Sequence, residues 1–259
     1  MAQRTARDDY LVVMTATIDP STGPARIARA DPKVRLEDYL SAMRFWLTLG
    51  DRRLRNVLFL ENSGYPLDEV QDLVDRHRPL YMDVELVSMR TNDYPPDKHY
   101  GYSELLMLDT GLARSRLAKR CRYWMKVTGR LTFPNVGRLL DRLPNDYLFA
   151  VDLRNAIPIF SPPQLWAHTR LLITTGPFYD EALRGICHRL PGGNYPIEMM
   201  LYDTFMKYRD RPGAILRFPV HVPPHGRSAF EDFSYQGAKR SAVDAARHVA
   251  RIVLPDWWI

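Results

Sequence analysis

Short apolar runs alternate with helical patterns along the first half of the chain, and this alternation restricts its fold more than any other feature. The runs are rich in β-branched and aromatic residues and most are bounded by turn-forming residues, as is typical of strands. Their apolar character is nearly continuous, so we expect strands that are covered on both faces. In chain order the runs are Tyr10–Ile18, Asn56–Leu60, Val84–Met89, Tyr123–Val127, Tyr147–Val151 and Leu171–Thr175.

Helical patterns separate these runs. The segment Arg35–Leu49 places its apolar side chains on one stripe and follows Asp31-Pro32, a typical helix start. Further helices are predicted at Leu67–Arg76, Ser103–Lys119, Val136–Leu143, Pro196–Tyr208 and about 237–254. Strands that alternate with helices indicate an α/β fold, so we predict a mostly parallel central sheet flanked by helices.

The charge balance favours anionic partners. The chain has 36 Lys and Arg against 30 Asp and Glu, a net charge of +6 over 259 residues. Phosphates and nucleotides suit such a balance, whereas no recognisable nucleic-acid module is present and we expect no nucleic acid. We find neither a secretory signal nor an apolar run long enough to span a membrane, and we therefore expect a cytoplasmic protein.

Several common catalytic motifs are absent. The first strand runs into Asp19-Pro20 where a dinucleotide site would have GxGxxG, and there is no GxxxxGK[ST] loop, GxSxG elbow or HExxH helix. His221 and His225 are four residues apart, but the prolines between them prevent a helical metal face. We therefore predict no metal site.

Polar residues follow the first two strands, at positions where ligands bind in doubly wound sheets. Thr15 and Thr17 are candidates for holding a nucleotide base or ribose, and ordinary β-branched strand residues are the alternative. Glu61 and Asn62 follow the second strand and are placed to bind a ligand. Capping of the next helix explains that segment equally well.

Lys98 and Gly101 precede the helix predicted to start at Ser103, and together they form a candidate phosphate cradle. Glu104 is also a candidate base. The alternative is that Glu104 only complements the helix dipole.

The fourth strand runs into a polar turn, Thr128-Gly129-Arg130, with Lys126 just before it. Gly129 lets a ligand approach the backbone closely, and the planar guanidinium of Arg130 suits a diphosphate.

Two candidates lie further along the chain. Glu198 stands at the start of a predicted helix, where it is either a general base or a residue that complements the helix dipole. His225 and Arg227 belong to a polar loop that is placed to close over a ligand.

In their order along the chain, these segments resemble a group of bacterial glycosyltransferases encoded with capsule, lipopolysaccharide or exopolysaccharide genes. The resemblance is carried by VVMTATIDP, RLEDYLSAMRFWL, LFLENSG, KHYGYSELLMLDTGLARS and WMKVTGRLTFPN, and covers residues 10–136 well. Residues 171–235 match more loosely, through TTGPFY, IEMMLYD and FPVHVPPHGRSA.

The resemblance implies a GT-A-like (Rossmann-related) fold in a single domain, 1–259. It would comprise a nucleotide-sugar-binding half at about 10–152, an acceptor-side half at about 153–235, and a C-terminal basic helix and Trp-rich tail at 236–259. The implied reaction is transfer of a sugar from a nucleotide-sugar donor to a glycan or lipid-linked acceptor in bacterial surface polysaccharide biosynthesis.

The chain departs from the GT-A pattern at one position. Many GT-A enzymes carry a metal-binding DxD at the end of the fourth strand, where this chain has Thr128-Gly129-Arg130. We therefore expect a reaction that requires no cofactor and no Mn²⁺ or Mg²⁺. Arg130, helped by Lys98, would stabilise the leaving diphosphate, and Glu198 or Glu104 would act as the base.

Alternatives remain open at this point. One is a non-catalytic nucleotide- or glycan-binding scaffold, and another is a nucleotidyltransferase, for which Asp152 is the strand-end carboxylate. The basic C-terminal helix with Trp257 and Trp258 suits either peripheral contact with the anionic inner face of the cell membrane or packing into a core or homodimer interface.

Overall fold

The computed structural model of the chain describes residues 10–154, 165–253 and 258. Within these residues a seven-stranded sheet forms the centre, with strand order β3-β2-β1-β4-β8-β5-β9. A small two-stranded sheet pairs β6 with β7. The strands are β1 (Tyr10–Ala16), β2 (Asn56–Glu61), β3 (Asp83–Ser88), β4 (Tyr123–Thr128), β5 (Phe149–Ala150), β6 (Leu153–Arg154), β7 (Trp166–Ala167), β8 (Leu171–Thr175) and β9 (Ala214–Ile215).

The central sheet is mostly parallel. β1 pairs in parallel with both β2 and β4, β2 pairs in parallel with β3, and β5 with β9. β8 runs antiparallel to its neighbours β4 and β5. The predicted α/β fold with a mostly parallel central sheet flanked by helices is therefore confirmed.

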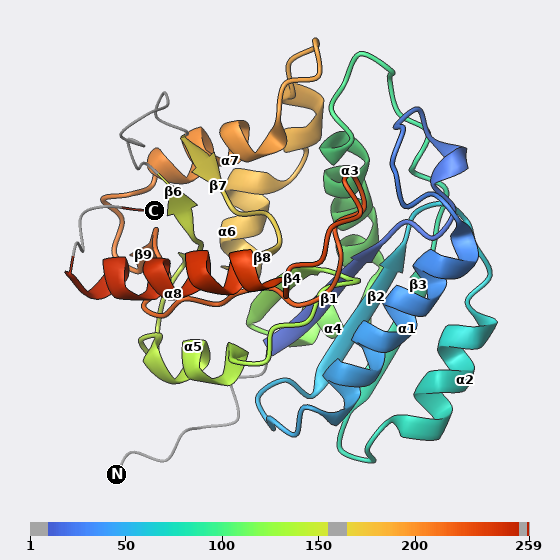
Figure 1. Cartoon of the computed structure of the whole chain (residues 1–259), viewed down its shortest axis with the longest axis horizontal. Helices are drawn as coiled ribbons and strands as arrows, with labels where there is room; N and C mark the ends of the chain where they lie inside the picture. The colour runs from blue at the N-terminus through green and yellow to red at the C-terminus, as the bar shows by residue number, and fades with distance from the viewer. Residues whose placement is uncertain (1–9, 155–164, 254–257, 259) are drawn as a thin grey trace.

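Helices cover both faces of the sheet (Figure 1). The alternate side chains of β1 divide between two cores: Val12 and Met14 pack with residues of α1, α2 and α5, whereas Leu11 and Val13 pack with residues of α3, α4 and α7. This division explains why the strand sequences are apolar on both faces. The helices are α1 (Pro32–Thr48), α2 (Asp68–His77), α3 (Gly101–Arg114), α4 (Arg116–Arg120), α5 (Val136–Arg142), α6 (Gly176–Phe178), α7 (Ile197–Met206) and α8 (Ala238–Val253).

Local chemistry accounts for the element boundaries. α1 begins three residues earlier than predicted, because the Asp31 carboxylate accepts a hydrogen bond from the backbone N–H of Lys33 and Pro32 occupies the first turn. The helix predicted at Ser103–Lys119 is instead two helices. Ser115 separates them, because its hydroxyl caps α4 and donates a hydrogen bond to Glu85.

Two predicted strands are shorter than expected. β1 ends at Ala16 instead of Ile18, and the chain then turns at Asp19, whose side chain accepts a hydrogen bond from the N–H of Ser21. The run Tyr147–Val151 contributes only Phe149–Ala150 to the sheet. Ile18, Tyr147 and Val151 lie outside these strands but are still buried, and apolar pattern alone cannot separate burial from pairing.

The predicted C-terminal helix is present as α8. It is held to the body by Arg251, which donates hydrogen bonds to both carboxylate oxygens of Asp152 and to the carbonyl of Phe218. Trp258 packs against the core that contains α3 and α7, as the packing alternative requires. Trp257 lies outside the described residues. Among the described helices, none has the length and apolar character that crossing a membrane demands.

Candidate functional site

A cavity of about 440 Å³ opens at the ends of β1 and β4, where the two parallel strands carry Thr15 and Thr128 in register. Its walls also include the start of α3, the start of α7, the residues just before β8 and the loop that precedes α8. This is the edge at which α/β sheets bind their ligands. The sequence-predicted residues that line it are Thr15, Thr17, Glu104, Thr128, Arg130 and Glu198.

A buried ion pair lies at the base of the cavity. Lys126 Nζ is 2.6 Å from Glu104 Oε1 and donates a second hydrogen bond to the carbonyl of Thr169. Thr15 donates its hydroxyl proton to the same Glu104 oxygen at 2.8 Å. Because Glu104 Oε1 accepts from both Lys126 and Thr15, its carboxylate is engaged by the protein, and its first role is to fix α3 to the sheet.

The Thr128-Gly129-Arg130 turn brings backbone rather than a ligand close to Gly129. Its N–H donates to the carbonyl of Thr15 at 2.9 Å, and a Cβ at this position would lie 2.7 Å from that oxygen. Glycine is therefore required for the close approach of β1 and the turn after β4.

Arg130 reaches from this turn into the cavity. Its Nε donates to the carbonyl of Arg227, and within the described part of the chain its two Nη atoms have no hydrogen-bond partner. The turn does not fit a divalent cation, since a hydroxyl and a guanidinium stand where metal ligation needs carboxylates. Nor do the described residues contain a cluster of three or more His, Cys, Asp or Glu able to hold a metal.

Glu198 is the buried cavity carboxylate that the protein engages least. It begins α7, is 7% exposed, and accepts one long hydrogen bond (3.4 Å) from the hydroxyl of Thr169 through Oε1. Its buried Oε2 has no hydrogen-bond partner among the described residues. Burial raises the pKa of Glu198, and the negative charge of Glu104 raises it further. A buried carboxylate with a raised pKa suits proton transfer.

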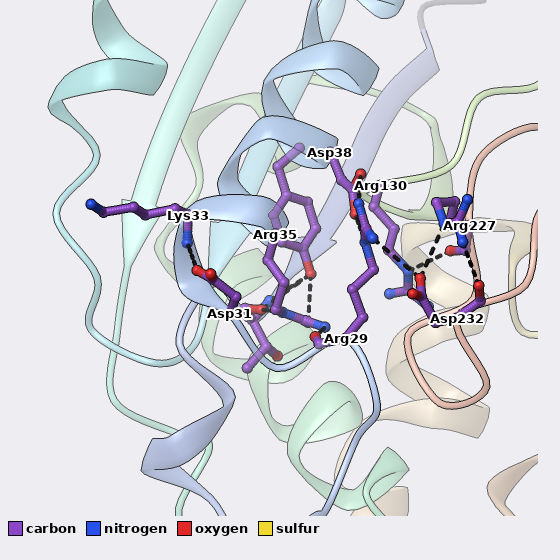
Figure 2. A network of polar contacts seen from close by, with 10 residues as sticks. Arg29, Asp31, Lys33, Arg35, Asp38, Arg130, Arg227 and Asp232 are labelled. Atoms are coloured by element: carbon purple, nitrogen blue, oxygen red, sulfur yellow. Dashed lines mark hydrogen bonds and ion pairs between the residues drawn. The ribbon is translucent and has the colours of Figure 1, made fainter.

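The loop before α8 forms one wall of the cavity and is held by ion pairs (Figure 2). Arg29 lies between Asp38 on α1 and Asp232 in the loop, at 2.6 Å and 3.1 Å. Arg227 also pairs with Asp232, at 3.0 Å, and its carbonyl accepts from Arg130. These contacts connect the loop to α1 and to the turn after β4, and thereby fix the loop as a wall of the cavity.

Seven of the predicted ligand residues have other contacts or lie outside the cavity. Glu61 is fully buried and accepts hydrogen bonds from three backbone N–H groups that follow β1 and β2. No side chain caps α2, which begins after Leu67, so the helix-capping alternative for this segment is wrong. Asn62 accepts from the hydroxyl of Thr17. Lys98 donates to the carbonyl of Leu190.

Gly101 packs against Ile197. A Cβ atom added at Gly101 would lie 2.4 Å from two side-chain carbons of Ile197, so this glycine allows α3 and α7 to pack closely. His225 pairs through its backbone with Thr132 and through its ring with Gln236. Arg227 is engaged by Asp232. Lys126 lies beneath the cavity in its ion pair with Glu104.

Sequence reasoning missed several cavity residues that come from loops. Tyr100 packs its ring 4.3 Å from that of Phe230. Burial, followed by the charges of Glu198 and Glu104, raises the pKa of Tyr100 far above its usual range, so its hydroxyl keeps its proton. Arg170 lines the cavity and stacks over the ring of Tyr235 at 5.0 Å. A mixture of arginine and aromatic residues in loops near strand ends was the available signal.

The nucleotidyltransferase alternative depends on Asp152, and that carboxylate lies outside the main cavity. Both of its oxygens accept from Arg251. Metal-assisted nucleotidyl transfer needs paired carboxylates at the phosphates, and this ion pair does not supply them.

No protein-family model matches the chain, and a comparison with curated proteins found no match. Several solved structures are similar in fold. An inositol-1-phosphate CTP transferase from T. maritima is 11% identical with a TM-score of 0.48, covering 93% of this chain and 96% of that chain. The bifunctional glycosyltransferase WbbM in its apo form is 10% identical with a TM-score of 0.48, and the match covers 82% of this chain and 39% of that chain.

Mouse xyloside xylosyltransferase 1, also without ligand, is 10% identical with a TM-score of 0.40, covering 80% of this chain and 84% of that chain. The names of these neighbours describe nucleotidyl- and glycosyltransferases. At such identities and TM-scores, the likeness assigns no activity to this chain, and none of the names concerns surface polysaccharide.

Proposed function

We propose that this chain is a nucleotide-dependent transferase, and specifically a glycosyltransferase that moves a sugar from a nucleotide-sugar donor to a glycan or lipid-linked acceptor. The observation that carries the proposal is the pair of groups in one cavity: the little-engaged Glu198 carboxylate and the cavity-facing guanidinium of Arg130. Glycosyl transfer needs a base for the acceptor and a cation for the leaving phosphate.

The two residues divide the reaction between them. Glu198 accepts the proton of an acceptor hydroxyl as its oxygen bonds to the anomeric carbon of the donor. The bond from that carbon to the phosphate oxygen breaks, and its electron pair leaves with the nucleoside diphosphate. Arg130 pairs with the charge that develops there, and Arg170 adds a second cation at the cavity wall.

The cavity also supports a nucleotide. Its volume lies within the range of small-molecule sites, and aromatic rings stand among its polar groups. Thr15 and Thr17, at the end of β1, lie where the proposal puts the nucleoside. The donor set after β4 does not fit a divalent cation, and the proposal therefore assigns the leaving phosphates to arginine. A setting in bacterial surface polysaccharide biosynthesis remains part of the proposal, as does contact with a membrane-borne acceptor.

The test is turnover of nucleotide sugars by the purified chain, followed as release of nucleoside diphosphate, with a Glu198→Gln variant. We expect kcat to fall by roughly 10²–10⁴-fold while nucleotide affinity is retained. Glu69→Gln is the matched control, because Glu69 is exposed on α2 and does not line the cavity. Equal activity of the wild type and the Glu198→Gln variant would contradict the role of Glu198. Nucleotide binding with no turnover of any donor would favour the scaffold alternative.

A further inference from the structure

Tyr100 and Phe230 form an aromatic pair in the wall of the main cavity. Their ring centroids are 4.3 Å apart. Tyr100 immediately precedes α3, and its ring also contacts that of His99, with 3.9 Å between the centroids. Phe230 lies in the loop before α8 and is 38% exposed. The cavity wall therefore contains a large apolar ring that a ligand can reach.

The loop that carries Phe230 is fixed on both sides of this residue. The carbonyl of Ala229 accepts a hydrogen bond from the N–H of Arg29 at 3.0 Å. The Arg29 side chain pairs with Asp232, on the other side of Phe230, at 3.1 Å (Figure 2). The ring is thus held in place before a ligand arrives, which lowers the entropy that binding costs.

The hydroxyl of Tyr100 has no hydrogen-bond partner in the described part of the chain, whereas the backbone carbonyl of this residue accepts from Ser103. Burial raises the pKa of Tyr100, and the negative charges of Glu198 and then Glu104 raise it further. The positive charge of Arg130 acts in the opposite direction and more weakly. The hydroxyl therefore keeps its proton, and it can both donate a hydrogen bond to a ligand and accept one.

The surroundings of Tyr100 favour an uncharged ligand over an anionic one. A phosphate beside its hydroxyl would be repelled by two carboxylates, those of Glu198 and Glu104. A saccharide carries no such charge. The C–H face of a pyranose ring is apolar and suits an aromatic ring, while its hydroxyl groups suit the neighbouring phenol. The pair therefore matches both surfaces of a neutral sugar.

A nucleobase also stacks on aromatic rings, so the position of the pair matters. The proposed function puts the nucleoside at Thr15 and Thr17 and brings the acceptor hydroxyl to Glu198. Of the charges that act on Tyr100, that of Glu198 is the strongest. This places the pair beside the proposed base and favours the acceptor as its ligand.

We propose that Tyr100 and Phe230 form an acceptor subsite that binds an uncharged pyranose ring. This inference rests on the proposed function, and it narrows the acceptor to a compound that ends in a neutral sugar. Phe230 stacks on the C–H face of that sugar, and the Tyr100 hydroxyl bonds to one of its hydroxyl groups. Another hydroxyl of the sugar then meets Glu198. A free glycan and a lipid-linked saccharide both carry such a ring.

The experiment measures binding of methyl glycosides to the whole chain by saturation-transfer NMR, with and without a saturating nucleoside diphosphate chosen from UDP, GDP, dTDP and ADP. The probes are the methyl glycosides of glucose, galactose, mannose and N-acetylglucosamine. We expect at least one to bind, and Phe230→Ala to weaken its binding by about fivefold or more. Phe230→Trp should restore the affinity to within about twofold. Phe230→Leu should not restore it, because stacking needs an aromatic ring.

Tyr100→Phe tests the hydroxyl by itself. It should weaken glycoside binding by about three- to tenfold and leave the melting temperature of the free protein unchanged, because the hydroxyl has no described protein partner to lose. Nucleotide affinity should stay within about twofold in all these variants. Tyr81→Ala and Tyr81→Phe are the matched controls, because Tyr81 is exposed between α2 and β3 and does not line the cavity.

Two results would overturn the inference. Absence of binding by every glycoside, or binding that the Phe230 and Tyr100 variants leave unchanged, would show that the pair only packs the loop against the start of α3. Weaker nucleotide binding in Phe230→Ala, together with competition between glycoside and nucleotide, would mean that the ring stacks on the nucleobase. Melting temperatures check the fold of each variant, and Phe230→Leu and Tyr100→Phe keep the test in force if Phe230→Ala does not fold.

The proposed function can fail separately. Glycoside binding that depends on Phe230, in a chain that binds no nucleotide, would contradict the proposed function and leave the saccharide site standing. Nucleotide binding with no glycoside bound would contradict the saccharide site alone. A hexyl glycoside of the same sugar separates the two sources of the ring. Affinity higher than that of the methyl glycoside by about tenfold or more indicates a lipid-linked saccharide, and a smaller difference indicates a glycan.

Discussion

Lys126 and Glu104 form a buried ion pair across the boundary between β4 and α3, with their side chains 5% and 19% exposed. From the sequence, Lys126 is a ligand candidate and Glu104 a catalytic candidate. Their contact with each other, and with Thr15, instead sets the position of α3 against the sheet. In the proposed reaction, the cavity residues Glu198 and Arg130 contact the substrates instead.

Removing one member of this pair should destabilise the fold strongly. Lys126→Met leaves Glu104 enclosed without its cation, and we expect a loss of about 3–5 kcal/mol in the free energy of unfolding. Lys126→Met combined with Glu104→Leu should recover part of that loss, because no charge remains buried. Urea denaturation of the wild type and of these two variants measures both effects. A loss of under about 1 kcal/mol in the single variant, as at a surface pair, would contradict the buried coupling.

Gly129→Ala should destabilise the chain by about 1–3 kcal/mol, because the new Cβ would meet the carbonyl of Thr15. Gly137→Ala is the control. That glycine lies in α5, a Cβ there has ordinary contact distances, and alanine favours helix by roughly 0.5–1 kcal/mol. Thermal or urea unfolding compares the two. Equal stability of both variants would mean that the turn after β4 is not held against β1.

Arg130→Ala should reduce activity far more than stability. The side chain makes one hydrogen bond to the protein, through Nε to the carbonyl of Arg227, and losing it should cost about 0.5–1.5 kcal/mol. Loss of a cation at the developing charge should lower kcat/KM by roughly 10²–10³-fold. Steady-state kinetics and urea unfolding of the same preparation supply the comparison. Proportionate losses of activity and stability would assign Arg130 to structure.

Glu198→Gln should make the free protein more stable at neutral pH. Burial raises the pKa of Glu198 above its unfolded value, so the folded protein binds the proton more tightly and loses stability as pH rises through the folded pKa. The uncharged glutamine avoids that loss. The advantage of the variant should vanish below the ordinary glutamate pKa, where the wild type is protonated in both states. Melting temperatures from pH 4 to pH 8 test this, and a variant that is less stable at pH 7 would refute it.

Six strands of the central sheet and most helices could be predicted from the sequence, because near-continuous apolar runs are typical of strands covered on both faces. The two-residue strands β6, β7 and β9 were not predicted, because so short a segment carries no periodic pattern. Their boundaries depend on single side-chain contacts, such as the Ser115 hydroxyl that divides α3 from α4. Thr15, Arg130 and Glu198 could be predicted as cavity residues because they lie at strand ends or at a helix start. Arg170 and Tyr100 were not, since the loops that carry them reach the cavity only after folding. Lys98 and Gly101 were predicted to form a phosphate cradle, but they contact other parts of the protein. A lysine near a glycine at a helix start has the same local sequence pattern in both situations.

The central claim is that the cavity at the ends of β1 and β4 binds a nucleotide through arginine. The most direct measurement is a thermal-shift comparison of UDP, GDP, CMP, dTDP and ADP, each with EDTA and with manganese, on the wild type and on Arg130→Ala. At a concentration about 100 times its dissociation constant, a nucleotide adds about 2.7 kcal/mol to the free energy of unfolding. This raises the melting temperature by several degrees. We predict such a rise for one nucleotide, unchanged by EDTA and much reduced in Arg130→Ala. A rise only with manganese, or no rise with any nucleotide, would contradict the account.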